Sequence, residues 1–211
     1  TTYPFERKPK SYYTGPDVWL KVFYLAVITE NQLTRSILNN VPDSAFEEKD
    51  VKAQHFDFTF VRFLKSLSGE EEHSIKLLEE AIQSAHSAEN NPETLNYRMS
   101  IQLPILQVFK SILTANSLLD NELEQLLSKH KEFWTSEGRT MEVKGWISLP
   151  AIALMKFAQI KGVPFTVESA ARNLQEYAAF RVVPATQWHR YLPGYNGEKN
   201  VVLARTAGPA R

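Results

Sequence analysis

The sequence has 211 residues, of which 43% are hydrophobic, and its 24 acidic and 24 basic side chains leave no net charge. A chain of this length can bury about 70% of the surface that its unfolded form exposes, so folding needs neither a metal nor a disulfide. It contains no cysteine, which excludes disulfides, thiolate metal sites, iron–sulfur clusters and cysteine nucleophiles.

Length and pattern predict one all-α domain over residues 1–211, an irregular bundle of stacked helical hairpins with about seven helices. Residues 1–16 are marked by prolines and are expected to be extended. Residues 182–211 are rich in proline and glycine, and we expect an irregular segment there with room for a short strand.

The first helix is predicted from the apolar run Val18–Ile28, with Asp17 as its N-cap and an extension to Leu38 before Pro42 ends it. Lys21 interrupts this run, which is also shorter than the ~20 residues of a membrane-spanning helix. We therefore expect a buried helix, no membrane contact and, because cysteine is lacking, a cytoplasmic location.

The segment from Phe56 to Leu67 fits two patterns. Its alternating phenylalanines suit a strand, whereas the apolar set as a whole shares one helical face, and we predict a helix that Gly69 stops. Residues 70–85 follow as a clearly amphipathic helix whose first turn is acidic.

The stretch 93–116 is predicted to be helical but to kink or split near Gln102, because Pro104 lies inside it. Another amphipathic helix follows from Leu119 and ends near Ser136. Alternating helices and breaks of this kind predict a bundle rather than a fibre or a regular repeat.

Beyond Gly145 a helix over 149–161 is predicted, capped by Ser148 and closed by Gly162. It is apolar on nearly every side, so we expect it to be central. A short extended link then leads to a helix capped by Ser169.

Reactive groups are not gathered in any recognised pattern. Glu70 and His73 form a Glu-x-x-His pair, but a di-iron site needs a second copy, so a solvated acidic turn is the better reading. No serine sits in a Gly-x-Ser-x-Gly turn, and the glycines form no phosphate-binding loop. We expect no metal, no cofactor and no enzymatic activity.

Charge is distributed unevenly along the chain. Residues 43–93 hold 12 acids and 5 bases, a net of −7, whereas residues 145–211 hold 3 acids and 8 bases, a net of +5. The bases are scattered singly, unlike the stripe of a nucleic-acid-binding protein, so direct nucleic-acid binding is not expected.

The segment from Phe133 to Ser169 resembles the signature region of the Immunity 49 family. The resemblance rests on an aromatic pair and a basic residue, then a glycine, an apolar helix with Leu-Pro, a second glycine and a serine. After this serine the chain departs from the family pattern. The matching residues, interpreted as structural, are Trp134, Arg139, Gly145, Leu149, Pro150, Gly162, Val167 and Ser169.

The resemblance implies an immunity protein that binds a cognate bacterial toxin domain, of the kind used in interbacterial competition and type VI secretion, and occludes its active site. The acidic segment favours a basic toxin that acts on nucleic acid or nucleotides; a merely solvated acidic face is the alternative. Exposed aromatics near the C-terminus would supply an interface hot spot, or pack over the bundle end. The candidate partner-binding residues are Glu47, Glu48, Glu70, Glu71, Glu72, Trp188, Tyr191 and Tyr195.

Two other functions fit the sequence. One is a helical adaptor of tetratricopeptide type that grips a peptide, which a regular concave surface of helix pairs would favour. The other is an enzyme or ligand-binding protein, which a deep pocket lined by titratable side chains would favour.

Overall fold

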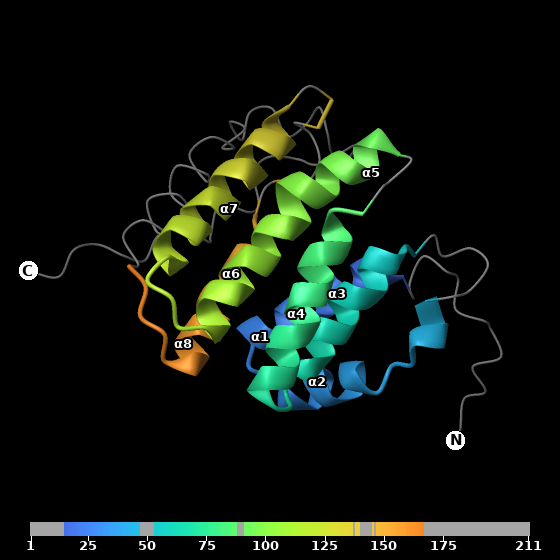
Figure 1. Cartoon of the computed structure of the whole chain (residues 1–211), viewed down its shortest axis with the longest axis vertical. Helices are drawn as coiled ribbons and strands as arrows, with labels where there is room; N and C mark the ends of the chain where they lie inside the picture. The colour runs from blue at the N-terminus through green and yellow to red at the C-terminus, as the bar shows by residue number, and fades with distance from the viewer. Residues whose placement is uncertain are drawn as a thin grey trace, which may run out of the picture.

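A computed structural model describes residues 15–46, 53–87, 91–136, 138–139, 145 and 147–166 (Figure 1). Every regular element in these ranges is helical, which confirms the all-α prediction. The expected extended start and the irregular segment 182–211 fall outside them.

Helices follow one another along the described chain, and α5, η3 and α6 join without a break. If these three are counted as one rod and the short turn η2 is left out, the described residues form seven helices, in agreement with the prediction of about seven. The elements are α1 (Pro16–Ile28), α2 (Gln32–Asn39), η2 (Asp43–Phe46), α3 (His55–Ser66), α4 (Glu71–Ala85), α5 (Pro92–Tyr97), η3 (Arg98–Gln102), α6 (Leu103–Leu113), α7 (Leu119–Thr135) and α8 (Leu149–Lys161).

The N-terminal helix differs from its prediction at both ends. It begins with Pro16 at its first position and Gly15 as N-cap, so Asp17 lies in the first turn and caps nothing. It also stops at Ile28, because Glu30 adopts a left-handed φ of 53° and Asn31 starts a new helix by accepting a hydrogen bond from the Thr34 N–H at 2.9 Å. One predicted helix is therefore the pair α1 and α2.

Three predictions for the middle of the chain are confirmed. The phenylalanine-rich segment is the helix α3, and its start is fixed by a reciprocal capping box between Gln54 and Asp57. It ends at Ser66, three residues before Gly69. The amphipathic helices α4 and α7 occupy the expected ranges.

Pro104 disturbs the regular helical hydrogen bonding of the long central rod near the predicted position, Gln102. Because proline has no N–H, the helix cannot continue its regular hydrogen bonds there, and the rod passes through a single π-helical turn, η3, that ends at Gln102. Pro104 itself lies in the first turn of α6, directly after the π-helical turn.

The core lies where α3, α4 and α6 meet. Phe63 of α3 packs edge-on against Phe109 of α6, with ring centroids 5.2 Å apart, and Phe109 packs against Phe157 of α8 at 5.6 Å. The buried hydroxyls of Thr59 and Ser84 are 2.6 Å apart, so the polar groups between α3 and α4 are satisfied. One continuous apolar cluster joins these helices to α1 and α7.

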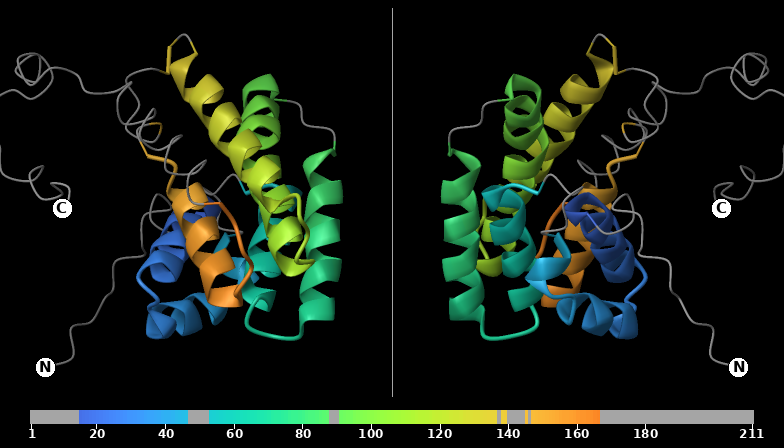
Figure 2. Two further views of the ribbon diagram at one scale, coloured as in Figure 1. Left: turned by 90° about the vertical axis from the view of Figure 1, so that its left-hand side faces the viewer. Right: turned by 90° about the vertical axis from the view of Figure 1, so that its right-hand side faces the viewer.

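Helix α8 is placed less centrally than predicted. It packs one face against α1 and α6, while Ile152 and Met155 are only partly buried, so it lies at one side of the described core (Figure 2). Gly162 closes it with a φ of 70°, as expected. Ser148 occupies the predicted N-cap position, but its hydroxyl makes no capping bond and is buried without a partner.

No helix in the described ranges combines the length and the apolar character that crossing a bilayer requires. The side chains of these ranges also bring no three histidines or carboxylates together in a way that could hold a metal ion.

Candidate functional site

An acidic group lies exposed where α3 turns into α4. Glu70 precedes α4, and Glu71 and Glu72 form its first turn, so all three carboxylates are at a helix N-terminus that favours negative charge. Lys161, at the end of α8, approaches Glu71 at 3.8 Å. Both partners are more than a third exposed, so this pair neutralises little of the acidic charge.

The end of α2 lies beside this turn. The Asn39 side-chain amide donates a hydrogen bond to the Ser68 hydroxyl at 3.0 Å. On α2 itself, Leu33 is 72% exposed and Ile37, one turn later, is 59% exposed. We call the five residues Leu33, Ile37, Glu70, Glu71 and Glu72 the corner surface.

The sequence pattern indicates that the acidic half of the corner surface is exposed, but it gives no sign that the apolar half is. Leu33 and Ile37 have the spacing of a buried helical face, so their pattern alone predicts the interior. The remaining candidate contact residues, Glu47, Glu48, Trp188, Tyr191 and Tyr195, lie outside the described residues.

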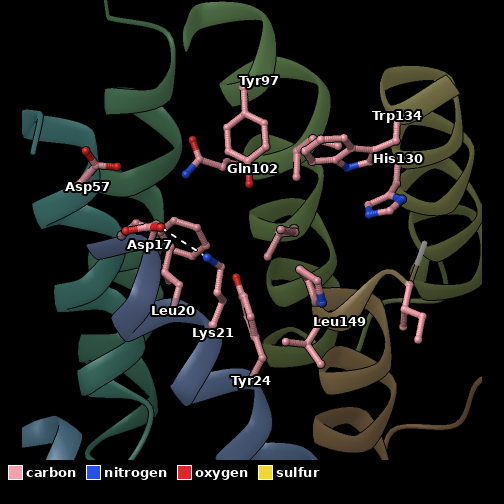
Figure 3. Close-up of a pocket in the computed structure, with 15 residues that line it drawn as sticks. Asp17, Leu20, Lys21, Tyr24, Asp57, Tyr97, Gln102, His130, Trp134 and Leu149 are labelled. Carbon is pink, nitrogen blue, oxygen red and sulfur yellow. Dashed lines mark hydrogen bonds and ion pairs between the residues drawn. The ribbon is translucent and has the colours of Figure 1, made fainter. Parts of the chain in front are cut away.

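A cavity of about 410 Å³ opens at the other end of α1 and α8 (Figure 3). Its walls come from α1, α3, α5, η3, α6, α7 and the start of α8. Asp17 and Lys21 form an ion pair across 3.3 Å at its edge. Aromatic and polar side chains that are distant in sequence converge on it, among them Tyr24, Asp57, Tyr97, Gln102, His130 and Trp134.

Two tyrosines that line this cavity have raised pKa values. Burial, with a contribution from Tyr97, raises the pKa of the Tyr24 phenol far above its usual range. Burial, together with the carboxylates of Asp17 and Asp57, raises the pKa of Tyr97 to about 12. Both phenols therefore stay protonated at neutral pH, where they can donate hydrogen bonds but cannot act as general bases.

The Glu-x-x-His pair noted in the sequence lies in the open. Glu70 and His73 are both exposed at the start of α4. They belong to the acidic turn and not to the cavity, which lies at the other end of the bundle.

Two of the signature residues pack around the end of α7. Trp134 is buried against Phe133, and Arg139 stacks its guanidinium over the Phe133 ring at 4.3 Å. Arg139 also donates a hydrogen bond to the Ser136 hydroxyl at 2.9 Å and approaches Glu93 at 3.5 Å. The aromatic pair and the basic residue thus form one packed unit.

The glycines and the proline of the signature act on the backbone. Gly145 approaches Trp134 so closely that a Cβ at this position would overlap the Trp134 Cβ and Cγ. Pro150 lies in the first turn of α8, and Gly162 supplies the left-handed residue that ends this helix. Ser169 lies outside the described residues.

Comparisons with known proteins show the family of this chain. Searches of curated proteins and of solved structures found no significant relative. A family model described as Immunity protein 49 matches residues 2–170, which includes every described residue and extends well beyond the signature region. The chain therefore belongs to the Immunity protein 49 family.

Proposed function

We propose that this immunity protein binds a cognate bacterial toxin directly and neutralises it by covering its active site. The observation that carries the proposal is the family match over residues 2–170. The chain would act in the cytoplasm of the bacterium that it protects, against toxins delivered between competing cells, for example by type VI secretion. The proposal requires no catalytic group.

The packed interior supports this mode of action. A protein that blocks another must present a preformed surface that buries on the order of 1,200–2,000 Å² with its partner. Aromatic contacts between α3, α6 and α8 lock the helices together, so the outer surface is held in one shape. A rigid surface loses little conformational freedom on binding.

We place the contact at the corner surface, with Glu70, Glu71 and Glu72 as its charged part. Toxins that act on nucleic acid or nucleotides need positive charge to hold their substrates. An acidic surface on the immunity protein would accelerate the encounter with such a toxin and compete for the same basic groups.

Charge reversal tests this placement. We expect Glu70→Lys/Glu71→Lys/Glu72→Lys to bind a catalytically inactive form of the cognate toxin about 10-fold more weakly or worse, mainly through slower association. The matched control is Glu79→Lys/Glu80→Lys/Glu124→Lys, which reverses three exposed carboxylates elsewhere on α4 and on α7. Surface plasmon resonance at low and physiological salt measures both rates.

The control should retain most of the wild-type affinity, because it makes the same change in net charge away from the corner. Equal losses in the two variants would mean that only net charge matters. Unchanged affinity and unchanged salt dependence in the corner variant would remove the corner from the contact.

A further inference from the structure

The apolar half of the corner surface is unusual for its degree of exposure. Single exposed leucines are common on protein surfaces and need no explanation. Here Leu33 and Ile37 lie one turn apart on the same side of α2, and Val22 and Leu25, 36% and 49% exposed, lie one turn apart on the adjoining α1. The α1–α2 hairpin therefore presents two apolar strips to solvent.

Helix α2 is held firmly in place, so the exposure does not come from a frayed end. Asn31 caps its start with a 2.9 Å hydrogen bond. The indole N–H of the buried Trp19 donates to the Leu38 carbonyl at 3.2 Å, and Asn39 binds Ser68 at 3.0 Å. The strip of Leu33 and Ile37 is thus presented in a preformed shape.

The segment after α2 is pinned to α3 as well. Asp43 accepts hydrogen bonds from Arg62 at 2.7 Å and from Lys65 at 3.1 Å, and Lys65 also donates to the Val41 carbonyl at 2.6 Å. Just before the start of α2, Glu30 forms an ion pair with Lys156 of α8 at 2.5 Å. Both ends of α2 are therefore fixed to neighbouring helices.

We propose that Leu33 and Ile37 are the apolar anchor of the toxin contact, and that they seat in an apolar depression bordered by lysine and arginine side chains on the toxin. This inference rests on the proposed function and adds the chemistry of the partner surface. An apolar centre with a charged rim is the usual anatomy of a protein interface.

The acidic residues Glu70, Glu71 and Glu72 indicate which kind of partner covers Leu33 and Ile37. The Asn39–Ser68 hydrogen bond fixes the α3–α4 turn, which carries the exposed Glu70, Glu71 and Glu72, to the end of α2, so these carboxylates lie near the helix that carries Leu33 and Ile37. A second copy of this chain in a two-fold contact would bring like charges together, which is unfavourable. A basic partner meets the same rim with opposite charge.

Two double substitutions test the anchor. In Leu33→Ala/Ile37→Ala the apolar contact is removed without new charge, and in Leu33→Asp/Ile37→Asp it is replaced by charge. We expect the alanine variant to bind the inactive cognate toxin about 10- to 100-fold more weakly, and the aspartate variant to show no measurable binding.

The matched control is Leu118→Asp/Ile147→Asp. These residues are 46% and 61% exposed, and they lie on the α6–α7 connection and at the cavity end of α8. The control introduces the same two charges on other parts of the surface, and we expect its affinity to match that of the wild type. Isothermal titration calorimetry measures affinity, thermal unfolding measures stability, and light scattering measures mass.

The outcomes separate this inference from the proposed function. If the wild-type chain does not bind the toxin, the proposed function fails. If the wild type binds and both strip variants bind equally well, the anchor alone is wrong. It is also wrong if the control loses binding while the strip variants keep it, because the toxin then docks near the cavity.

Two further results would assign the strip another occupant and overturn the proposal. A fall of several degrees in the melting temperature of the alanine variant would show that this chain itself covers the strip. A wild-type dimer that the aspartate variant converts to a monomer would show that a second copy covers it.

Discussion

The centre of the bundle and its α2 corner both carry large apolar side chains, which are buried at the centre and exposed at the corner. At the centre, Phe60, Phe63 and Leu106 are completely buried between α3, α4 and α6. At the corner, Leu33 and Ile37 are held by equally definite contacts of α2 but face solvent. Burial stabilises the first group, whereas the second group is available to a partner.

From this comparison we expect that stability and binding can be separated in this molecule. At the centre, aromatic rings pack on one another and the Thr59 and Ser84 hydroxyls satisfy each other. At the corner, α2 packs against neighbouring helices on one side only, and its other side is exposed to solvent. Substitutions in the centre should therefore remove the fold, and substitutions at the corner should remove binding alone.

The largest expected effect is at the centre. Phe63→Ala removes a fully buried ring that packs on Phe109, and we expect the free energy of unfolding to fall by about 3–5 kcal/mol. Leu33→Ala removes an apolar side chain from solvent and should change it by less than about 0.5 kcal/mol. Urea unfolding followed by circular dichroism measures both, and similar losses would erase the distinction.

An intermediate effect is expected at the edge of the interior. In Gly145→Ala the added methyl group meets the Trp134 side chain, so α7 and the chain before α8 must move apart. We expect a loss of about 1–3 kcal/mol from this overpacking. A Gly145→Ala variant as stable as the wild type would show that the two segments can separate without cost.

A smaller loss of stability is expected at the contacts that hold the corner in place. Partial burial would raise the pKa of Asp43, but hydrogen bonds and charges from Arg62 and Lys65 outweigh it and hold the pKa below its ordinary value. Because the pKa is lowered, the ionised carboxylate stabilises the fold above about pH 3.9 and loses this effect as the pH falls through the lowered value.

Asp43→Asn should therefore reduce the free energy of unfolding by less than about 1 kcal/mol at pH 7. The difference from the wild type should shrink as the pH is lowered toward the acid limit of the folded state. Urea unfolding at several pH values measures it, and a difference independent of pH would assign Asp43 a role other than its charge.

Patterns confined to one helix could be read from the sequence. The break near Gln102 follows from the missing N–H of Pro104, and the end of α8 follows from the conformational freedom of Gly162. The split between α1 and α2 also had a local signal, since Asn31 is a strong N-cap residue.

Features that depend on packing could not be read in this way. Leu33 and Ile37 repeat with a helical period whether their side faces the core or solvent, so only the fold shows that they are exposed. The cavity joins Tyr24, Tyr97 and His130 from three separate elements. The spacing of these residues in the sequence does not show that they line the same cavity.

We propose that the chain acts by contact with the toxin and not by catalytic turnover. The most direct test is a titration of the cognate toxin's activity with the purified chain. We predict that inhibition is complete at one chain per toxin molecule and that the toxin regains its activity when the complex is separated. Complete inhibition far below one equivalent, or a toxin that stays inactive after separation, would contradict the account.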